Sequence, residues 1–234
     1  VEVFHSLKSV LKDKNYNIGV GDEGGFAPKF ANGNTEAFEL ILSAIEKAGY
    51  RAGTDFVLGI DAAASEFYKD GMYHLSIENS SLSAKDLISY YEKWFQKYPI
   101  ATVEDMLAED DWENWVELKK VTDKYNLPLI GDDLTVTSKE RLQKAIDMNA
   151  IGAILIKLNQ IGSMTETIDC CMLAKQHGMM TVPSHRGGGE TNDTAIVDLA
   201  VAVGSKYIKV GPTRGERVSK YNRLMEIERE LSQE

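Results

Sequence analysis

From residue 55 onward, the chain alternates short apolar runs with longer segments whose apolar residues recur every three or four positions. Short continuous apolar runs are typical of strands buried on both faces of a parallel sheet, and the longer segments are typical of amphipathic helices. The alternation predicts six strand-helix units. The predicted strands lie at residues 56–60, 101–103, 127–130, 153–156, 179–182 and 207–208, and the predicted helices at 83–98, 111–125, 138–148, 163–178, 191–204 and 215–231.

The residues before the first predicted strand follow a different pattern. Residues 2–14 and 35–49 each carry an apolar stripe at helical period, whereas VGDEGGFAP at 20–28, which connects them, has neither helical nor strand periodicity. Residues 67–78 are predicted to form a small hairpin with Asp70 and Gly71 at its turn. No linker or low-complexity stretch interrupts the chain, so we expect one domain over residues 1–234.

Six parallel strands fit either an open doubly wound sheet or most of an eight-stranded barrel. The loop after the first predicted strand, GIDAAASEF, lacks the GxGxxG fingerprint, which argues against the dinucleotide-binding form of the open sheet. Polar residues at the strand ends favour the barrel. We therefore expect an α/β fold in which a helix pair precedes six βα units of an incomplete TIM barrel.

Each predicted strand is followed within a few residues by an ionisable side chain. Enzymes with a parallel barrel place their chemistry at the carboxyl ends of the strands, which open at one mouth. The signs are segregated, because acids follow the first three strands and cations follow the last three. In chain order these side chains are Asp61, Glu104 with Asp105, Asp132 with Asp133, Lys157, His185 with Arg186, and Lys209.

This arrangement of charge predicts a metal site beside an anion site. Carboxylates that converge from three neighbouring strands repel one another unless a cation binds them, and hard oxygen ligands of this kind suit Mg²⁺. The cations opposite them would hold an anionic substrate. A lysine serves as a base at neutral pH when neighbours lower its pKa, and nearby cations act in that direction. The alternative interpretation is a set of salt bridges at the barrel rim without chemistry.

Composition limits the partners and the location. The net charge of −10 argues against binding to nucleic acid, and no apolar run approaches the length of a membrane span. Cys170 and Cys171 are adjacent in a predicted helix and poorly placed to bridge each other, so we expect a reducing compartment, the cytoplasm. Because the chain begins with Val1 and not with Met, we expect it to be a piece of a longer protein.

Seven stretches of the chain resemble the C-terminal part of enolase, in the family's order and at near-family spacing. They are VGDEGGFAP, GIDAAASEF, VEDMLAEDDW, IGDDLTVTS, ILIKLNQIGSMTET, SHRGGGET and RVSKYNRLMEIEREL. The resemblance implies a Mg²⁺-dependent lyase of glycolysis that interconverts 2-phosphoglycerate and phosphoenolpyruvate, removing the α proton and expelling water. It also implies a homodimer in the full-length protein.

The resemblance assigns roles to individual positions. It implies that Asp61, Glu104 and Asp132 are the ligands of Mg²⁺, that Lys157 is the base, and that Glu23 is the acid that protonates the leaving hydroxyl. Asp105 and Asp133 are expected to be structural. The residues expected to contact the substrate are Lys157, His185, Arg186, Gly187 and Lys209.

Two departures from the family leave alternatives open. SHRGGGET stands where the family has SHRSGET, so Gly187 replaces a substrate-binding serine and one residue is inserted. The family's first two barrel strands and its N-terminal domain are absent from this chain, so we expect the 234 residues alone to be weakly active or inactive. The alternatives are a related lyase or racemase acting on another carboxylate, and a binding fragment without catalysis.

Overall fold

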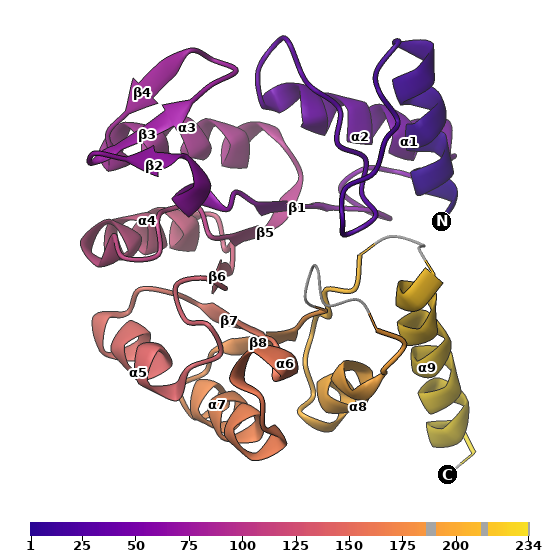
Figure 1. The fold of residues 1–234 in the computed structure, drawn as a ribbon, viewed down its shortest axis with the longest axis vertical. Coiled ribbons are helices and arrows are strands. Elements are labelled where there is room, and N and C mark those ends of the chain that lie inside the picture. The colour runs from indigo at the N-terminus through magenta and orange to yellow at the C-terminus, as the bar shows by residue number, and fades with distance from the viewer. Residues whose placement is uncertain (186–190, 212–214, 234) are drawn as a thin grey trace.

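A curved parallel sheet runs through the middle of the molecule (Figure 1). The computed structural model describes residues 1–185, 191–211 and 215–233. Successive strands pair side by side in chain order, as in a barrel, and form an open half-barrel. The strands are β1 (Leu58–Asp61), β5 (Ile100–Glu104), β6 (Leu129–Gly131), β7 (Ala153–Ile156) and β8 (Met180–Pro183).

We predicted six strands in this sheet, and the described residues form five. The segment predicted as the sixth strand makes one isolated parallel bridge, between Ser184 and Lys209. Its apolar run is only two residues long, and Gly211, at φ 75°, turns the chain soon afterwards. The single bridge nevertheless fixes Lys209 beside β8, because the Lys209 N–H donates to the Pro183 carbonyl at 2.9 Å.

The predicted helices are present, with two differences. The segment at 191–204 is helical only at Ala195–Ala202, and the short helix Leu158–Ile161 was not predicted. Figure 1 shows α3 (Ala84–Lys97), α4 (Trp112–Lys124), α5 (Lys139–Met148) and α7 (Met164–Gln176) along one side of the sheet. Ser83 and Ser138 cap α3 and α5, where each hydroxyl accepts a backbone N–H of the first turn. The remaining helices after β7 are α6 (Leu158–Ile161), α8 (Ala195–Ala202) and α9 (Gly215–Leu231). Cys170 and Cys171 are buried free thiols on α7, as we predicted.

The N-terminal pair consists of α1 (Glu2–Asp13) and α2 (Thr35–Lys47), which pack through Val10, Leu11, Leu40 and Ala44. The VGDEGGFAP connection between them is a narrow turn. Val20 and Phe26 form an antiparallel bridge, and the Gly21 N–H donates to the Gly25 carbonyl at 2.9 Å. This closed turn carries Asp22 and Glu23 on an exposed tip.

The predicted hairpin is confirmed and has one more strand. After the short helix η1 (Ala64–Phe67), strands β2 (Tyr68–Lys69), β3 (Met72–Leu75) and β4 (Ser80–Leu82) form an antiparallel sheet. Asp70 and Gly71 both have positive φ, as a tight two-residue turn requires. The buried Tyr73 hydroxyl donates to Asp111 at 2.8 Å and accepts the Ala108 N–H at 3.0 Å. Tyr73 thereby ties this small sheet to the loop that follows β5.

The main apolar core fills the space between the half-barrel and the helices beside it. It includes Trp115 and Leu118 of α4 and Ile154 and Ile156 of β7, all fully buried. Within the described part of the chain, no helix is long and apolar enough to cross a membrane.

Replacing Tyr73 by Phe will lower the free energy of unfolding by about 1–3 kcal/mol, because the Ala108 N–H loses the one acceptor that it has among the described residues. Urea unfolding of the Tyr73→Phe variant measures this loss. The matched control is Tyr68→Phe, an exposed tyrosine beside Tyr73, for which we expect a change within about 0.5 kcal/mol. Equal effects of the two substitutions would show that the Tyr73 hydroxyl does not stabilise the loop.

Candidate active site at the strand ends

One lysine joins carboxylates at the ends of two neighbouring strands. Asp61 ends β1 and Glu104 ends β5, and the two residues are register partners in the sheet. Lys209 Nζ lies 2.7 Å from Asp61 Oδ2 and 2.7 Å from Glu104 Oε1. Because Lys209 comes from the segment beside β8, these ion pairs connect the two opposite edges of the half-barrel.

A second ion pair lies at the ends of the next two strands. Lys157, directly after β7, places Nζ 2.5 Å from Asp132 Oδ2, directly after β6. Both side chains are largely buried, at 16% and 10% exposure. Among the described residues, the buried Asp132 Oδ1 has no hydrogen-bond partner. A buried carboxylate oxygen without a partner is costly, so this atom is well placed to coordinate a cation.

Asp105 holds the turn that carries Asp132. Its carboxylate oxygens accept the N–H of Asp132 at 3.0 Å and the N–H of Asp133 at 2.8 Å. This contact is the structural role that we predicted for Asp105. The carboxylates of Asp105, Asp132 and Asp133 lie within 4.8 Å of one another and form a second arrangement able to bind a metal. We favour Asp105 as a clamp because both of its oxygens already accept backbone donors.

Burial and mutual repulsion set the protonation of the acids. Burial, together with the charges of Asp61 and Asp132, raises the pKa of Glu104 to about 8 against the attraction of Lys209. Burial also raises the pKa of Asp105 to about 7. Burial lowers the pKa of Lys209, but Glu104 and Asp61 together outweigh it and raise that pKa above the usual value. The Lys209 ammonium therefore stays charged at neutral pH, and the labile proton belongs to Glu104.

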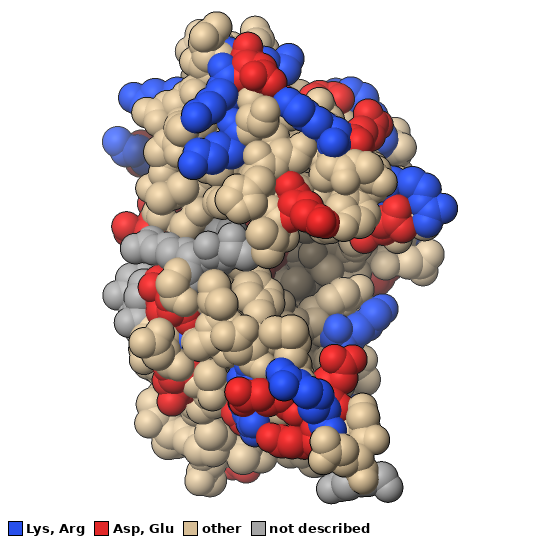
Figure 2. Space-filling model, turned by 90° about the vertical axis from the view of Figure 1, so that its right-hand side faces the viewer, with Lys and Arg blue, Asp and Glu red and all other residues tan. Residues whose placement is uncertain are grey.

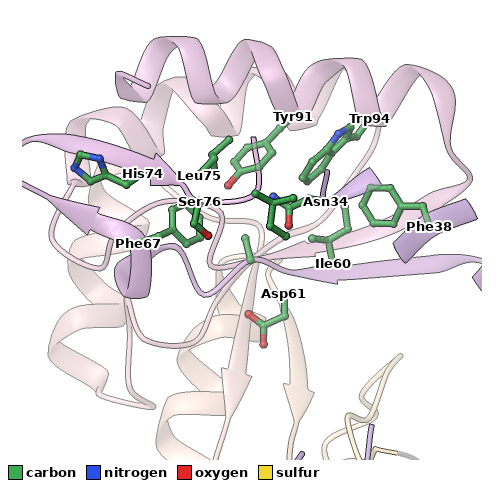
Figure 3. A pocket seen from close by; sticks show the side chains of 12 residues that line it. Asn34, Phe38, Ile60, Asp61, Phe67, His74, Leu75, Ser76, Tyr91 and Trp94 are labelled. Carbon is green, nitrogen blue, oxygen red and sulfur yellow. The ribbon is translucent and has the colours of Figure 1, made fainter. Parts of the chain in front are cut away.

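Two hollows adjoin Asp61. One, of about 340 Å³, is lined by the strands themselves, including Asp61, Glu104, Ile130, Val182 and Lys209. The other, also about 340 Å³, lies between α2, β3 and α3. Figure 3 shows Phe38, Tyr91 and Trp94 on one side of this second hollow, while the Asp61 carboxylate points away from them. The Asp61 carboxylate is therefore assigned to the first hollow, the one lined by the strands.

The surface around the sheet is hollowed as well. Figure 2 shows a depression between the upper and lower halves of the molecule, with acidic and basic side chains above and below it.

The remaining predicted site residues lie around this cluster or outside the described part. His185 is buried after β8, and its N–H donates to the Lys209 carbonyl at 2.9 Å. Glu23 is exposed on its turn, and within the described residues its carboxylate makes no hydrogen bond or ion pair. Arg186 and Gly187 lie outside the described residues. The structure thus joins Asp61, Glu104 and Lys209 in one group and Asp132 and Lys157 in another.

One residue at the site had no place in the sequence-based prediction. The Thr137 hydroxyl accepts the N–H of Lys157 at 2.9 Å. The available signal was the pair of threonines in LTVTS directly after a predicted strand, because threonine hydroxyls near a turn often bind backbone groups. That signal does not reveal which backbone group is bound.

Comparison with known families agrees with this geometry. The family model "Enolase, C-terminal TIM barrel domain" matches residues 1–234. The match extends over the helix pair, the five parallel strands and the strand-end charges. The chain therefore belongs to the enolase family, of which it contains the C-terminal TIM barrel domain.

Proposed function

We propose that the protein is a Mg²⁺-dependent lyase that interconverts 2-phosphoglycerate and phosphoenolpyruvate in the cytoplasm, as a homodimer when full length. The observation that carries the proposal is the presence of two ion-paired groups at neighbouring strand ends of an enolase-family barrel. One group is Asp61 and Glu104 with Lys209, and the other is Asp132 with Lys157. Carboxylates beside lysines suit a reaction that removes a proton next to a substrate carboxylate.

Asp61, Glu104 and Asp132 are the residues that would hold Mg²⁺. They offer hard oxygen donors from three neighbouring strands, and Asp132 Oδ1, which has no hydrogen-bond partner in the described part of the chain, is available for coordination. Two lysines oppose three carboxylates, so the fully ionised cluster keeps a net negative charge that favours a cation. Bound Mg²⁺ supplies electrostatic stabilisation of the charge that develops on the substrate carboxylate.

The proposal assigns the two proton transfers of the reaction to different side chains. Lys157 Nζ must first lose the proton that it holds in its ion pair with Asp132, and the neutral amine then takes the proton from the α carbon. Lys209 contacts the substrate carboxylate on which the electron pair is delocalised. The bond from the β carbon to its hydroxyl then breaks, and Glu23 supplies the proton that turns the leaving group into water. His185, Arg186 and Gly187 complete the substrate contacts around the phosphate and the leaving hydroxyl.

The replacement of the family serine by Gly187 favours one alternative, a related lyase or racemase acting on another carboxylate. A panel of α-hydroxy and amino acids, scored by deuterium exchange at the α carbon, separates the two proposals. Exchange with 2-phosphoglycerate alone excludes this alternative.

Full-length protein with Mg²⁺ will form phosphoenolpyruvate from 2-phosphoglycerate, and Lys157→Ala will lower kcat by about 10²–10⁴-fold because the base is removed. Ultraviolet absorbance of phosphoenolpyruvate measures both rates. The control is Lys120→Ala, an exposed lysine on α4 whose loss we expect to leave kcat unchanged. Absence of product from the wild-type protein, alongside an active control enolase, contradicts the proposal.

Asp61→Asn will weaken Mg²⁺ binding by more than about tenfold, because a ligand loses its charge. Isothermal titration of full-length protein measures the affinity. Asp133→Asn is the matched control, since Asp133 belongs only to the alternative cluster with Asp105 and Asp132. The opposite result, with Asp133→Asn the more damaging change, places the metal in that alternative cluster.

The affinity for Mg²⁺ will rise with pH up to about 8 and then level off. Glu104, with a pKa of about 8, holds a proton at neutral pH that must leave before the carboxylate binds a metal. Titration at pH 7 in two buffers of different ionisation enthalpy will therefore show close to one proton released per ion bound, and Glu104→Gln will abolish that release. Binding at pH 7 without proton release would contradict the assignment of Glu104 as a ligand.

A further inference from the structure

Lys157 contacts one loop through both its backbone and the tip of its side chain. The loop is residues 132–137, which follow β6, whereas Lys157 follows β7. At the end of the side chain, Lys157 Nζ lies 2.5 Å from Asp132 Oδ2. At the backbone, the Lys157 N–H donates to Thr137 Oγ1 at 2.9 Å. The position of the amine therefore depends on two contacts with the same short segment.

The backbone contact replaces a missing sheet hydrogen bond. The last pair between β6 and β7 is Gly131 with Ile154, after which the chain of β6 leaves the sheet. β7 continues beside β8, and the Ile156 carbonyl accepts the Ser184 N–H at 2.8 Å. Successive residues of a strand direct their backbone groups to opposite neighbours, so the Lys157 N–H faces the side that β6 has left. The Thr137 hydroxyl supplies the acceptor that this N–H requires.

Thr137 is itself fixed in an unusual conformation. It is 1% exposed, at φ 56°, and the preceding Val136 is at φ 45°. Two consecutive β-branched residues in the left-handed region are strained, and such strain persists where the surrounding structure enforces it, often at functional sites. Hydrogen bonds from Val136 N–H to the Asp132 carbonyl at 2.8 Å and from Thr137 Oγ1 to Gln160 Oε1 at 3.3 Å hold it there.

The loop is also anchored to the metal-site side of the barrel. Asp105, next to Glu104 on the chain, accepts the N–H groups of Asp132 and Asp133 at the start of the loop. A continuous set of contacts thus runs from the end of β5 through the loop to Lys157. A base that is misplaced by about 1 Å loses about 10²-fold in rate, so the rigidity of this connection matters for proton transfer.

We infer that Thr137 is a positioning residue, whose hydroxyl sets the backbone of Lys157 and thereby the reach of the Lys157 amine toward the α carbon of the substrate. The inference rests on the proposed function, because it assigns Thr137 a part in the same proton abstraction. Thr137 acts through Lys157 and needs no contact with the substrate or the metal.

The test compares three variants of the full-length protein at saturating Mg²⁺. Thr137→Val removes the hydroxyl at nearly constant shape, and Thr137→Ser keeps it. The matched control is Thr135→Val, since Thr135 is also buried in this loop but its hydroxyl donates to the Gly131 carbonyl at 2.9 Å. We expect Thr137→Val to lower kcat by about 10²-fold with little change in KM, Thr137→Ser to restore most of it, and Thr135→Val to remain near wild type.

Two further readouts separate positioning from a general loss of stability. With 2-phosphoglycerate deuterated at the α carbon, the isotope effect on kcat will increase in Thr137→Val, because proton removal becomes the slow step. Hydrogen exchange of the Lys157 amide will be faster in Thr137→Val than in Thr135→Val, because only the first variant removes its acceptor. If Thr137→Val does not fold, Thr137→Ala replaces it in the same comparisons.

Equal kcat values for Thr137→Val and Thr135→Val, or a Thr137→Ser variant as slow as Thr137→Val, overturn the inference while leaving the proposed function intact. A wild-type protein that forms no phosphoenolpyruvate refutes the proposed function before any variant is compared. In that case the amide exchange alone decides whether Thr137 fixes Lys157, and unchanged exchange in Thr137→Val overturns that contact as well.

Discussion

Repulsion among acids at the strand ends is the constraint on which the site depends. Glu104 and Asp132 are buried and Asp61 lies beside them, so each carboxylate needs a nearby positive charge or a proton. Lys209 and Lys157 supply two of these charges, and each contacts an acid from a different strand. The sheet order brings the charges together, and their pairing in turn fixes the residues that follow β6, β7 and β8.

Much of the fold follows from local pattern. Apolar runs between amphipathic segments predicted the five parallel strands and the helices, because both are set by which faces are buried. Ser83 and Ser138 begin two of these predicted segments, and in the structure each caps its helix by accepting a backbone N–H of the first turn. The sixth predicted strand failed because a run of two apolar residues does not determine how far a ladder continues beyond the Ser184–Lys209 bridge.

The sequence pattern predicted which charged residues follow the strands, but it predicted only in part how these residues contact one another. The charged residues after successive strands predicted a group that includes Asp61, Glu104, Asp132, Lys157 and Lys209, because the carboxyl ends of parallel barrel strands lie at the same end of the barrel. Which acid pairs with which lysine depends on how the sheet curves, and that curvature leaves no local signal. Thr137 was missed for a similar reason, because its hydroxyl replaces a hydrogen bond lost where β6 ends sooner than β7.

The ion pair between Asp61 and Lys209 has a consequence for how the protein acquires its chemistry. The two residues are 148 positions apart in the chain, yet their side chains lie 2.7 Å from each other. Closing so long a loop carries an entropic cost that is repaid only after the intervening strands have formed. The cluster therefore cannot form within any local segment: it requires the strand order that brings the segment beside β8 back to β1.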